Sequence, residues 1–193
     1  MTEFLLIRHG ETEWSRTGRH TGRTDVPLTG DGEAKARALA PRLAGREFAL
    51  QLCSPLARAR HTAALAGLHP EIDDDLLEWD YGAWEGRTTA DIRTELQEPS
   101  WVVWDADIPA GATPGERPYD VAVRAQRVID RCLPVLEAGN DAVLIAHGHL
   151  LRILAATWLG LPADAGRLLA LDAGALSALG FERRQRVIAA WNT

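Results

Sequence analysis

The chain of 193 residues is 46% hydrophobic, 25% charged and 6% aromatic, which excludes a fibre, a disordered tail and a disulfide scaffold. Its 21 basic and 27 acidic residues give a formal net charge of -6, so no broad basic surface is expected for nucleic acid or an anionic membrane. Lys35 is the only lysine, so all other basic residues are arginines, which favour two-pronged binding of carboxylate or phosphate. Any anion must therefore be bound by a local cluster of arginines.

The chain has two cysteines, Cys53 and Cys132, from which neither a CxxC motif nor a disulfide framework can be formed. The apolar run near the N-terminus, residues 4–7, is too short for a signal peptide or a membrane span. No linker or internal repeat divides the sequence. We therefore expect a single domain over residues 1–193 in the cytoplasm.

Apolar runs alternate with helix-capping signals along the first third of the chain. Residues 4–7 predict a buried strand, and residues 48–53 predict a second one. Thr29 can cap a helix that runs to about residue 44. Ser54 is expected to be the N-cap of a further helix over 55–65, with a proline at its first position.

The same alternation continues to the end of the chain. The further predicted elements are helices over 89–97 and 119–137, a buried strand over 142–146, a helix over 150–159 and a hairpin over 175–191. This order predicts a three-layer α/β fold, in which a mostly parallel sheet is flanked by helices on both faces. The hairpin is expected to add an antiparallel element.

Three predicted strand-to-helix junctions carry histidine or arginine: RHGET at 8–12, SPLARAR at 54–60 and AHGH at 146–149. In a doubly wound sheet these junctions lie along one edge, where helix N-termini also direct backbone amides at an anion. Taken alone, His9 or His147 is better interpreted as a hydrogen-bonded polar residue at the end of a buried strand. Because the pattern recurs at equivalent junctions, the sequence predicts a phosphate site.

Four motifs follow one another in a fixed order: LLIRHGETEW at 5–14, SPLARA at 54–59, EWDYG at 78–82 and AHG at 146–148. In this order they resemble the histidine phosphatase superfamily, also called phosphoglycerate mutase-like, and the resemblance covers nearly the whole chain. Together with residues 21–29, the motifs are most similar to the sedoheptulose-1,7-bisphosphatase-like branch. The resemblance implies the fold of that superfamily.

The resemblance also implies a role for each matching residue. It implies a nucleophile at His9, which becomes a phosphohistidine, and a proton donor at Glu78. The implied phosphate-binding residues are Arg8, Arg58 and His147, and the implied substrate-binding residues are Ser15, Thr21, Gly22, Gly148 and His149. Glu85 is a rival candidate for the proton donor, but the family motif places that role at the position of Glu78.

Physical chemistry agrees with these roles, because phosphoryl transfer spreads negative charge over oxygens that fixed donors can stabilise. Arg8, Arg58 and a protonated His147 would supply that positive charge, so neither a metal nor another cofactor is expected. The proton donor would protonate the leaving oxygen and afterwards deprotonate the hydrolytic water.

The expected activity is hydrolysis of small phosphorylated metabolites such as sugar phosphates. Mutases of this superfamily shield the phosphohistidine with extra, partly basic segments. The segment from Glu78 to residue 116 is short, and most of its charged residues are acidic. The alternatives are a mutase-type phosphotransferase and a non-catalytic phosphate-binding module, although such a module needs no proton donor. A small phosphorylated substrate is the expected partner, nucleic acid and membranes are not, and a homodimer stays open.

Two other enzyme classes have weaker support in the sequence. His147 and His149 could form half of a metal site, but no carboxylate or cysteine lies at ligand spacing. Asp105 and Asp107 superficially resemble the aspartate pair of haloacid dehalogenase-type phosphatases, but no lysine occurs downstream. A solvated loop is the better interpretation of the aspartate pair.

Overall fold

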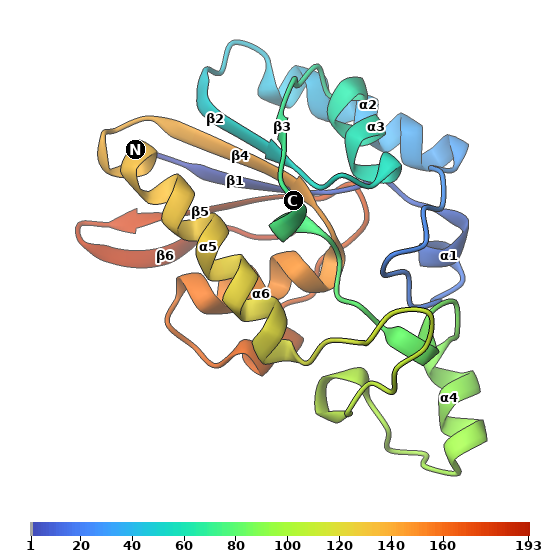
Figure 1. The fold of residues 1–193 in the computed structure, drawn as a ribbon. Helices are drawn as coiled ribbons and strands as arrows, with labels where there is room; N and C mark the ends of the chain where they lie inside the picture. Colours follow the sequence, from blue (N-terminus) through green and yellow to red (C-terminus); the bar gives the residue numbers. More distant parts are fainter. Residues whose placement is uncertain (1) are drawn as a thin grey trace.

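The computed structural model describes residues 2–193 and contains a six-stranded sheet in the order β3-β2-β4-β1-β5-β6 (Figure 1). The strands are β1 (Phe4–Arg8), β2 (Phe48–Cys53), β3 (Glu71–Ile72), β4 (Asp141–Ala146), β5 (Leu176–Glu182) and β6 (Gln185–Ala190). Strands β1 to β4 pair parallel with one another, whereas β5 pairs antiparallel with both β1 and β6. The predicted, mostly parallel sheet with an antiparallel hairpin is confirmed.

Six α-helices occur in the described part of the chain: α1 (Glu13–Arg16), α2 (Gly30–Leu43), α3 (Ala57–Leu65), α4 (Thr89–Leu96), α5 (Pro118–Glu137) and α6 (Gly148–Trp158). The Thr29 side chain caps α2 by accepting a hydrogen bond from the amide of Gly32, as expected from the sequence. Thr88 caps α4 in a capping box with Asp91. Short 3-10 turns lie at Asp74–Leu76, Gly82–Trp84, Val103–Asp105 and Ala163–Leu168.

The prediction that Ser54 caps the helix after β2 is wrong. Helix α3 begins at Ala57, and its N-cap is Leu56, which has no side-chain capping bond. The hydroxyl of Ser54 lies instead 2.7 Å from Nε2 of His147, 93 positions away in the sequence. Ser54 therefore belongs to the group of polar side chains at the sheet edge.

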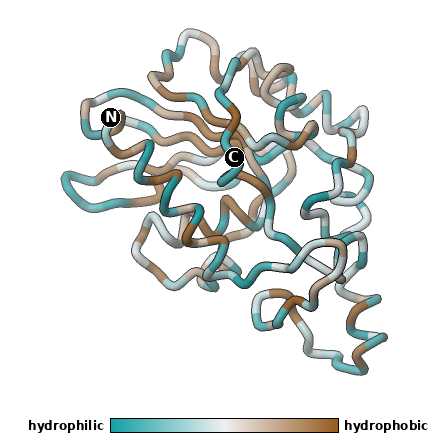
Figure 2. Tube along the Cα trace, in the orientation of Figure 1, coloured by the Kyte–Doolittle hydropathy of each residue, from teal (hydrophilic) through white to brown (hydrophobic). Residues whose placement is uncertain are grey.

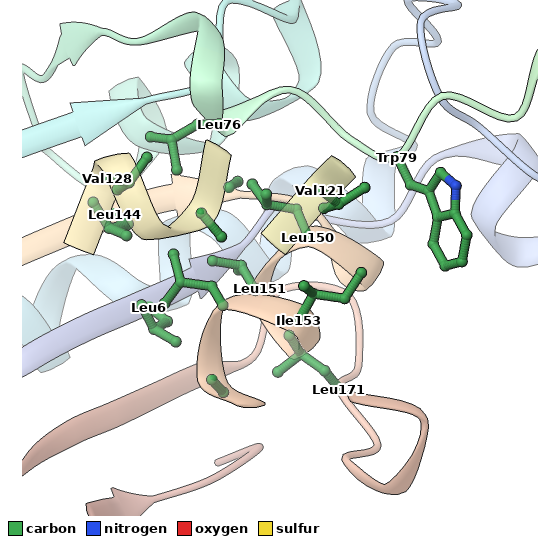
Figure 3. Close-up of a cluster of buried hydrophobic side chains, with 14 of the residues drawn as sticks. Leu6, Leu76, Trp79, Val121, Val128, Leu144, Leu150, Leu151, Ile153 and Leu171 are labelled. Atoms are coloured by element: carbon green, nitrogen blue, oxygen red, sulfur yellow. The ribbon is translucent and has the colours of Figure 1, made fainter. Parts of the chain in front are cut away.

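Alternation along the strands divides the core into two layers, because successive strand residues face opposite sides of the sheet. Leu5 and Ile7 belong to the layer that contains residues of α2 and α3. Leu6 belongs to the larger layer with residues of α5 and α6, as the close-up in Figure 3 shows. Hydrophobic segments follow the central strands in Figure 2, and the two core layers bury both faces of the sheet as predicted.

The carboxyl ends of the parallel strands point towards the side of the molecule that carries α1 and α4 (Figure 1). On that side, the loop after β1 packs closely on the first turn of α2: a Cβ on Gly10 would lie 2.4 Å from the carbonyl oxygen of Gly32. Glycine at this position therefore permits the close approach. Within residues 2–193, none of the helices has both the length and the apolar character that crossing a membrane requires.

Candidate active site

Backbone hydrogen bonds hold the three polar junctions of the sheet edge together. The amide of His9, after β1, donates to the carbonyl oxygen of Ala146 at 2.9 Å, and the amide of Ser54, after β2, donates to that of Ile145 at 3.0 Å. Both acceptors belong to the end of β4. The loops that carry the histidines and arginines therefore leave neighbouring strands at one level, as the sequence predicts.

His9 is buried and has a single defined proton position. Its Nδ1 lies 2.7 Å from the carbonyl oxygen of Gly10, and because a carbonyl only accepts, Nδ1 must carry the proton. Nε2 is then unprotonated, and no side chain or backbone group of residues 2–193 forms a hydrogen bond with it. Burial lowers the pKa of His9 well below its usual value, and the charges of Arg58 and Arg8 lower it further. The imidazole is therefore neutral, with an unprotonated Nε2.

His147 lies beside His9, with the ring centroids 5.1 Å apart. Nε of Arg58 donates to Nδ1 of His147 at 3.2 Å, so the proton of this imidazole is on Nε2, which donates to Ser54. Burial and the charge of Arg58 lower the pKa of His147 well below its usual value. The expectation of a protonated His147 is therefore wrong for this structure, in which the ring is a neutral hydrogen-bond donor.

The Arg58 guanidinium is fully buried and is held by backbone carbonyl groups of the loop after α1. It donates to the carbonyl oxygen of Thr24 at 2.7 Å, to that of Gly22 at 2.9 Å and to that of Thr21 at 3.2 Å. Burial lowers the pKa of Arg58, and the charges of Glu78 and Asp25 oppose this effect. The guanidinium fixes this loop against the sheet edge beside His147.

Arg8 lies against the N-terminus of α6 and holds an unused donor. Its Nη1 donates to the carbonyl oxygen of Leu171, whereas its buried Nε has no partner in the described residues. A Cβ on Gly148 would lie 3.2 Å from the Arg8 guanidinium, so glycine allows this close contact. A buried donor without a partner is costly, and an anion bound at Arg8 would satisfy it.

The carboxyl group of Glu78 lies at the N-terminus of α6 and accepts three backbone hydrogen bonds. Oε1 accepts from the amides of Trp79 and Leu150, each at 2.9 Å, and Oε2 accepts from the amide of His149 at 3.1 Å. Amides at a helix N-terminus favour this placement of a carboxyl group. Oε2 accepts only one of these bonds and therefore has more room than Oε1 for a further partner.

A buried ion pair supports the segment that carries Glu78. Arg124, on α5, donates to the carbonyl oxygens of Asp75, Leu77 and Glu78, and it forms an ion pair of 2.8 Å with Glu116. The carboxylate of Glu116 also accepts from the amide of Asp80. Most of these contacts join residues 36 to 49 positions apart in the chain, so local sequence patterns do not predict the arrangement.

The largest group of candidate residues opens onto one cleft of about 410 Å³. Seven of the sequence-predicted residues line it: Arg8, His9, Ser15, Thr21, Glu78, Gly148 and His149. Arg58, His147 and Gly22 do not line the cleft but contact one another beside it. The structure therefore brings all ten residues to one edge of the sheet and places three of them behind the cleft wall.

The loop residues Ser15 and Gly22 have well-defined partners. Ser15 belongs to the capping box at the start of α1, in which its hydroxyl accepts from the amide of Thr12 at 2.9 Å. The amide of Gly22 donates to the carboxylate of Glu85 at 2.9 Å, and the amide of Thr24 donates to the same group at 3.0 Å. Glu85, the rival proton donor, is therefore engaged with this loop and does not line the cleft.

Several side chains surround the sequence-predicted His149 on the outer cleft wall, and among them His20 and Arg19 were not predicted. His149 lies among aromatic rings: its Nδ1 is 2.6 Å from the Tyr81 hydroxyl, and its ring centroid is 5.0 Å from that of Trp104. Arg152 stacks on Trp104 with its guanidinium carbon 4.8 Å from the ring centroid. His20 and Arg19 complete this wall. Burial lowers the pKa of His149 well below its usual value, so the imidazole is neutral.

The other chemical interpretations find no support in the described residues. From Thr2 to Thr193, no group of three or more His, Cys, Asp or Glu side chains could hold a metal ion. Asp105 forms an ion pair with Arg167, and Asp107 forms one with Arg117 at 2.9 Å, so both aspartates lie outside the cleft.

Comparison with known proteins agrees with the fold. Residues 4–193 match the model of the histidine phosphatase superfamily (branch 1). The chain is 40% identical over 189 residues to an acid phosphatase of Mycobacterium tuberculosis, covering 96% of this chain and 89% of that protein. It is 33% identical over 186 residues to a sedoheptulose 1,7-bisphosphatase of Saccharomyces cerevisiae, covering 81% and 67%. A solved Mycobacterium tuberculosis structure, of open reading frame Rv3214, superposes with a TM-score of 0.90 at 36% identity, covering 99% and 97%.

The chain therefore belongs to the histidine phosphatase superfamily, and it is an enzyme of the phosphatase type. This membership agrees with the resemblance seen in the sequence motifs and with the α/β fold.

Proposed function

We propose that the chain hydrolyses phosphomonoesters of small metabolites, such as sugar phosphates, through a phosphohistidine at His9 and without a metal ion. The observation that carries this proposal is the proton arrangement of His9, whose Nδ1–H is bound to Gly10 and whose Nε2 is free. Glu78 and the unused donor of Arg8 line the same cleft. A nucleophile, a carboxyl group and an anion-binding guanidinium thus meet in one place.

In the first step, Nε2 of His9 attacks phosphorus, and the bond from phosphorus to the leaving oxygen breaks. The electron pair of that bond goes to the leaving oxygen, which takes a proton from Glu78. Arg8 and Arg58 stabilise the negative charge on the phosphoryl oxygens. His147 donates its Nε2–H to a phosphoryl oxygen. In this structure Ser54 accepts that hydrogen bond, but a charged phosphoryl oxygen is a stronger acceptor than a hydroxyl group.

In the second step, water replaces the histidine. Glu78, now a carboxylate, takes a proton from the water as its oxygen attacks phosphorus. The bond between nitrogen and phosphorus breaks, its electron pair returns to Nε2 of His9, and inorganic phosphate leaves. Glu78 regains in the second step the proton that it gave up in the first, and Nε2 of His9 regains its electron pair.

Trapping the intermediate tests this proposal directly. Wild type incubated with radiolabelled sugar phosphate and quenched rapidly is expected to carry label on His9 that is labile to acid and stable to base. His9→Ala is expected to remove both the label and turnover. His69→Ala, at an exposed histidine, is the matched control and should retain both. Label on an aspartate or a serine would contradict the mechanism.

Two further arms of the same experiment address the alternatives. Exhaustive chelation is expected to leave activity intact, because Arg8 and Arg58 supply the charge that a metal would otherwise provide. Activity that disappears with chelator and returns with a divalent ion would contradict the metal-independent proposal. With phosphoglycerates as substrate, release of inorganic phosphate supports hydrolysis, whereas interconversion without release identifies a mutase.

A further inference from the structure

The carbonyl group that holds the proton of His9 belongs to a glycine. The Gly10 oxygen accepts from Nδ1 of His9 at 2.7 Å, and glycine has the least restricted backbone of all residues. The local sequence therefore does not set the direction of this carbonyl. Contacts from elsewhere in the fold must hold the Gly10 backbone, because a rotated carbonyl would leave the proton on Nδ1 without its acceptor.

Two hydrogen bonds hold the peptide group that joins His9 to Gly10. The amide of Gly174 donates to the carbonyl oxygen of His9 at 3.0 Å. At the other end of the same peptide group, the amide of Gly10 donates to the hydroxyl oxygen of Thr62 at 3.0 Å. The first bond joins two backbone groups, so Thr62 supplies the side chain that holds this peptide.

Thr62 lies in α3, where its hydroxyl has a fixed direction. The side chain is fully buried, and its hydroxyl donates to the carbonyl oxygen of Arg58, one turn earlier in the helix, at 2.8 Å. Because this bond uses the only hydroxyl proton, the oxygen faces the Gly10 amide as an acceptor. Three hydrogen bonds, linked through the Gly10 backbone, therefore connect the start of α3 with the imidazole of His9.

We propose that Thr62 is a positioning residue, whose hydroxyl fixes the Gly10 backbone and thereby keeps the proton of His9 on Nδ1 and the ring in its attacking orientation. This inference rests on the proposed function, because it takes His9 as the nucleophile. An imidazole that carries its proton on Nε2 has no electron pair there for phosphorus. The reactivity of His9 then depends on one buried hydroxyl group.

The tautomer of His9 in the protein without substrate tests this inference. Proton–nitrogen NMR spectra distinguish the two neutral tautomers of a histidine, and comparison with His9→Ala assigns the signals. Wild type is expected to show the Nδ1–H form alone. Thr62→Val keeps the shape of the side chain but removes the hydroxyl, so it is expected to show both forms. Thr62→Ser keeps the hydroxyl and should give the wild-type spectrum.

Single-turnover kinetics test the effect on the reaction. Nitrophenyl phosphate is the substrate, because its leaving oxygen needs no proton and the rate then reports on the nucleophile. Phosphoenzyme formation is expected to slow about 10²-fold in Thr62→Val, the loss that a displacement of about 1 Å can cause, and to recover in Thr62→Ser. The Kd of inorganic phosphate should stay at the wild-type value, because Arg8 and Arg58 keep their guanidinium groups. Unaltered phosphate binding also shows that each variant has folded.

Thr157→Val is the matched control. The Thr157 hydroxyl donates to the carbonyl oxygen of Ile153 at 2.9 Å, the same bond within a helix that Thr62 makes in α3. Thr157 lies at the opposite end of α6 from Gly148, which lines the cleft. This variant should keep the wild-type tautomer and rate. If Thr62→Val does not fold, Thr62→Cys replaces it and should also show both tautomers, because a thiol is a weak acceptor.

The outcomes separate this inference from the proposed function. Thr62→Val with the wild-type tautomer and rate overturns the positioning role and leaves the hydrolase intact. Slower phosphorylation in both Thr62→Val and Thr62→Ser, with the wild-type tautomer in each, also overturns it, because that result shows a general packing role. A wild type that forms no phosphohistidine contradicts the proposed function. The tautomer measurement needs no substrate, so it decides separately whether Thr62 holds the proton of His9 on Nδ1.

Discussion

The chemistry of His9 depends on one carbonyl group. Because the Gly10 oxygen can only accept, it holds the proton on Nδ1 and leaves Nε2 unprotonated, as the proposed nucleophile requires. Burial and two nearby arginines lower the pKa of His9, so the neutral form persists at a pH below the usual histidine value. The proposed nucleophile is therefore not lost by protonation in mildly acidic solution.

The proposed role of Glu78 predicts a dependence on the leaving group. Glu78→Gln is expected to slow the phosphorylation step for sugar phosphates by about 10²- to 10⁴-fold, the usual contribution of general acid catalysis. Nitrophenyl phosphate should be affected far less, because its leaving oxygen needs no proton. Single-turnover formation of the phosphoenzyme from both substrates measures the difference.

Glu85→Gln is the matched control for this prediction. The carboxylate of Glu85 binds the amides of Gly22 and Thr24 outside the cleft, so its loss should slow both substrates to a similar degree. A selective defect in Glu85→Gln, with equal losses in Glu78→Gln, would transfer the role of proton donor to Glu85.

Among the elements, the segment before α4 depends on α5 for its position. The buried Arg124 of α5 binds three carbonyl groups around Glu78 and pairs with Glu116, whose side chain is 16% exposed. An arginine in this arrangement replaces the regular hydrogen bonds that a loop lacks. The geometry of the proposed proton donor is therefore fixed by a helix that begins 40 positions later.

Removal of Arg124 is expected to destabilise the fold and misplace Glu78. Arg124→Met leaves the Glu116 carboxylate and three carbonyls without their partner, and breaking a buried pair in this way costs about 3–5 kcal/mol. Arg127→Met, one turn away on α5, removes an exposed ion pair with Asp75 and should cost at most about 1 kcal/mol. Urea unfolding measures both. A loss below about 1 kcal/mol in Arg124→Met would contradict the supporting role.

For the whole molecule, the sequence predicted what local pattern and strand order determine. Apolar runs located the central strands, and the rule for sheet edges brought His9, Arg58 and His147 together before any contact was known. Contacts between side chains that are distant in the sequence could not be predicted from these patterns. Ser54 was expected to cap a helix and instead binds His147, because the local capping preference yields to a buried imidazole that needs an acceptor.

Burial of neutral histidines is a property of the whole fold with a consequence for its stability. Burial holds the pKa values of His9, His147 and His149 well below the usual value and lowers that of His20 to about 4. In the unfolded chain these side chains bind protons near pH 6.5. The unfolded state therefore takes up more protons than the folded state below that pH, and stability falls with acidity.

We expect the free energy of unfolding to decrease between pH 7 and pH 5, with a contribution of about 2 kcal/mol from His20, as linkage predicts for a group whose pKa is about 4 in the folded protein. His20 provides the cleanest test, because it is 9% exposed and is not one of the proposed catalytic groups. In His20→Gln the loss between pH 7 and pH 5 should shrink by about 2 kcal/mol, whatever the substitution does to stability at pH 7. Urea unfolding at both pH values, with His69→Gln at an exposed position as the control, measures this difference. An unchanged loss in His20→Gln would show that His20 is protonated in the folded protein at pH 5.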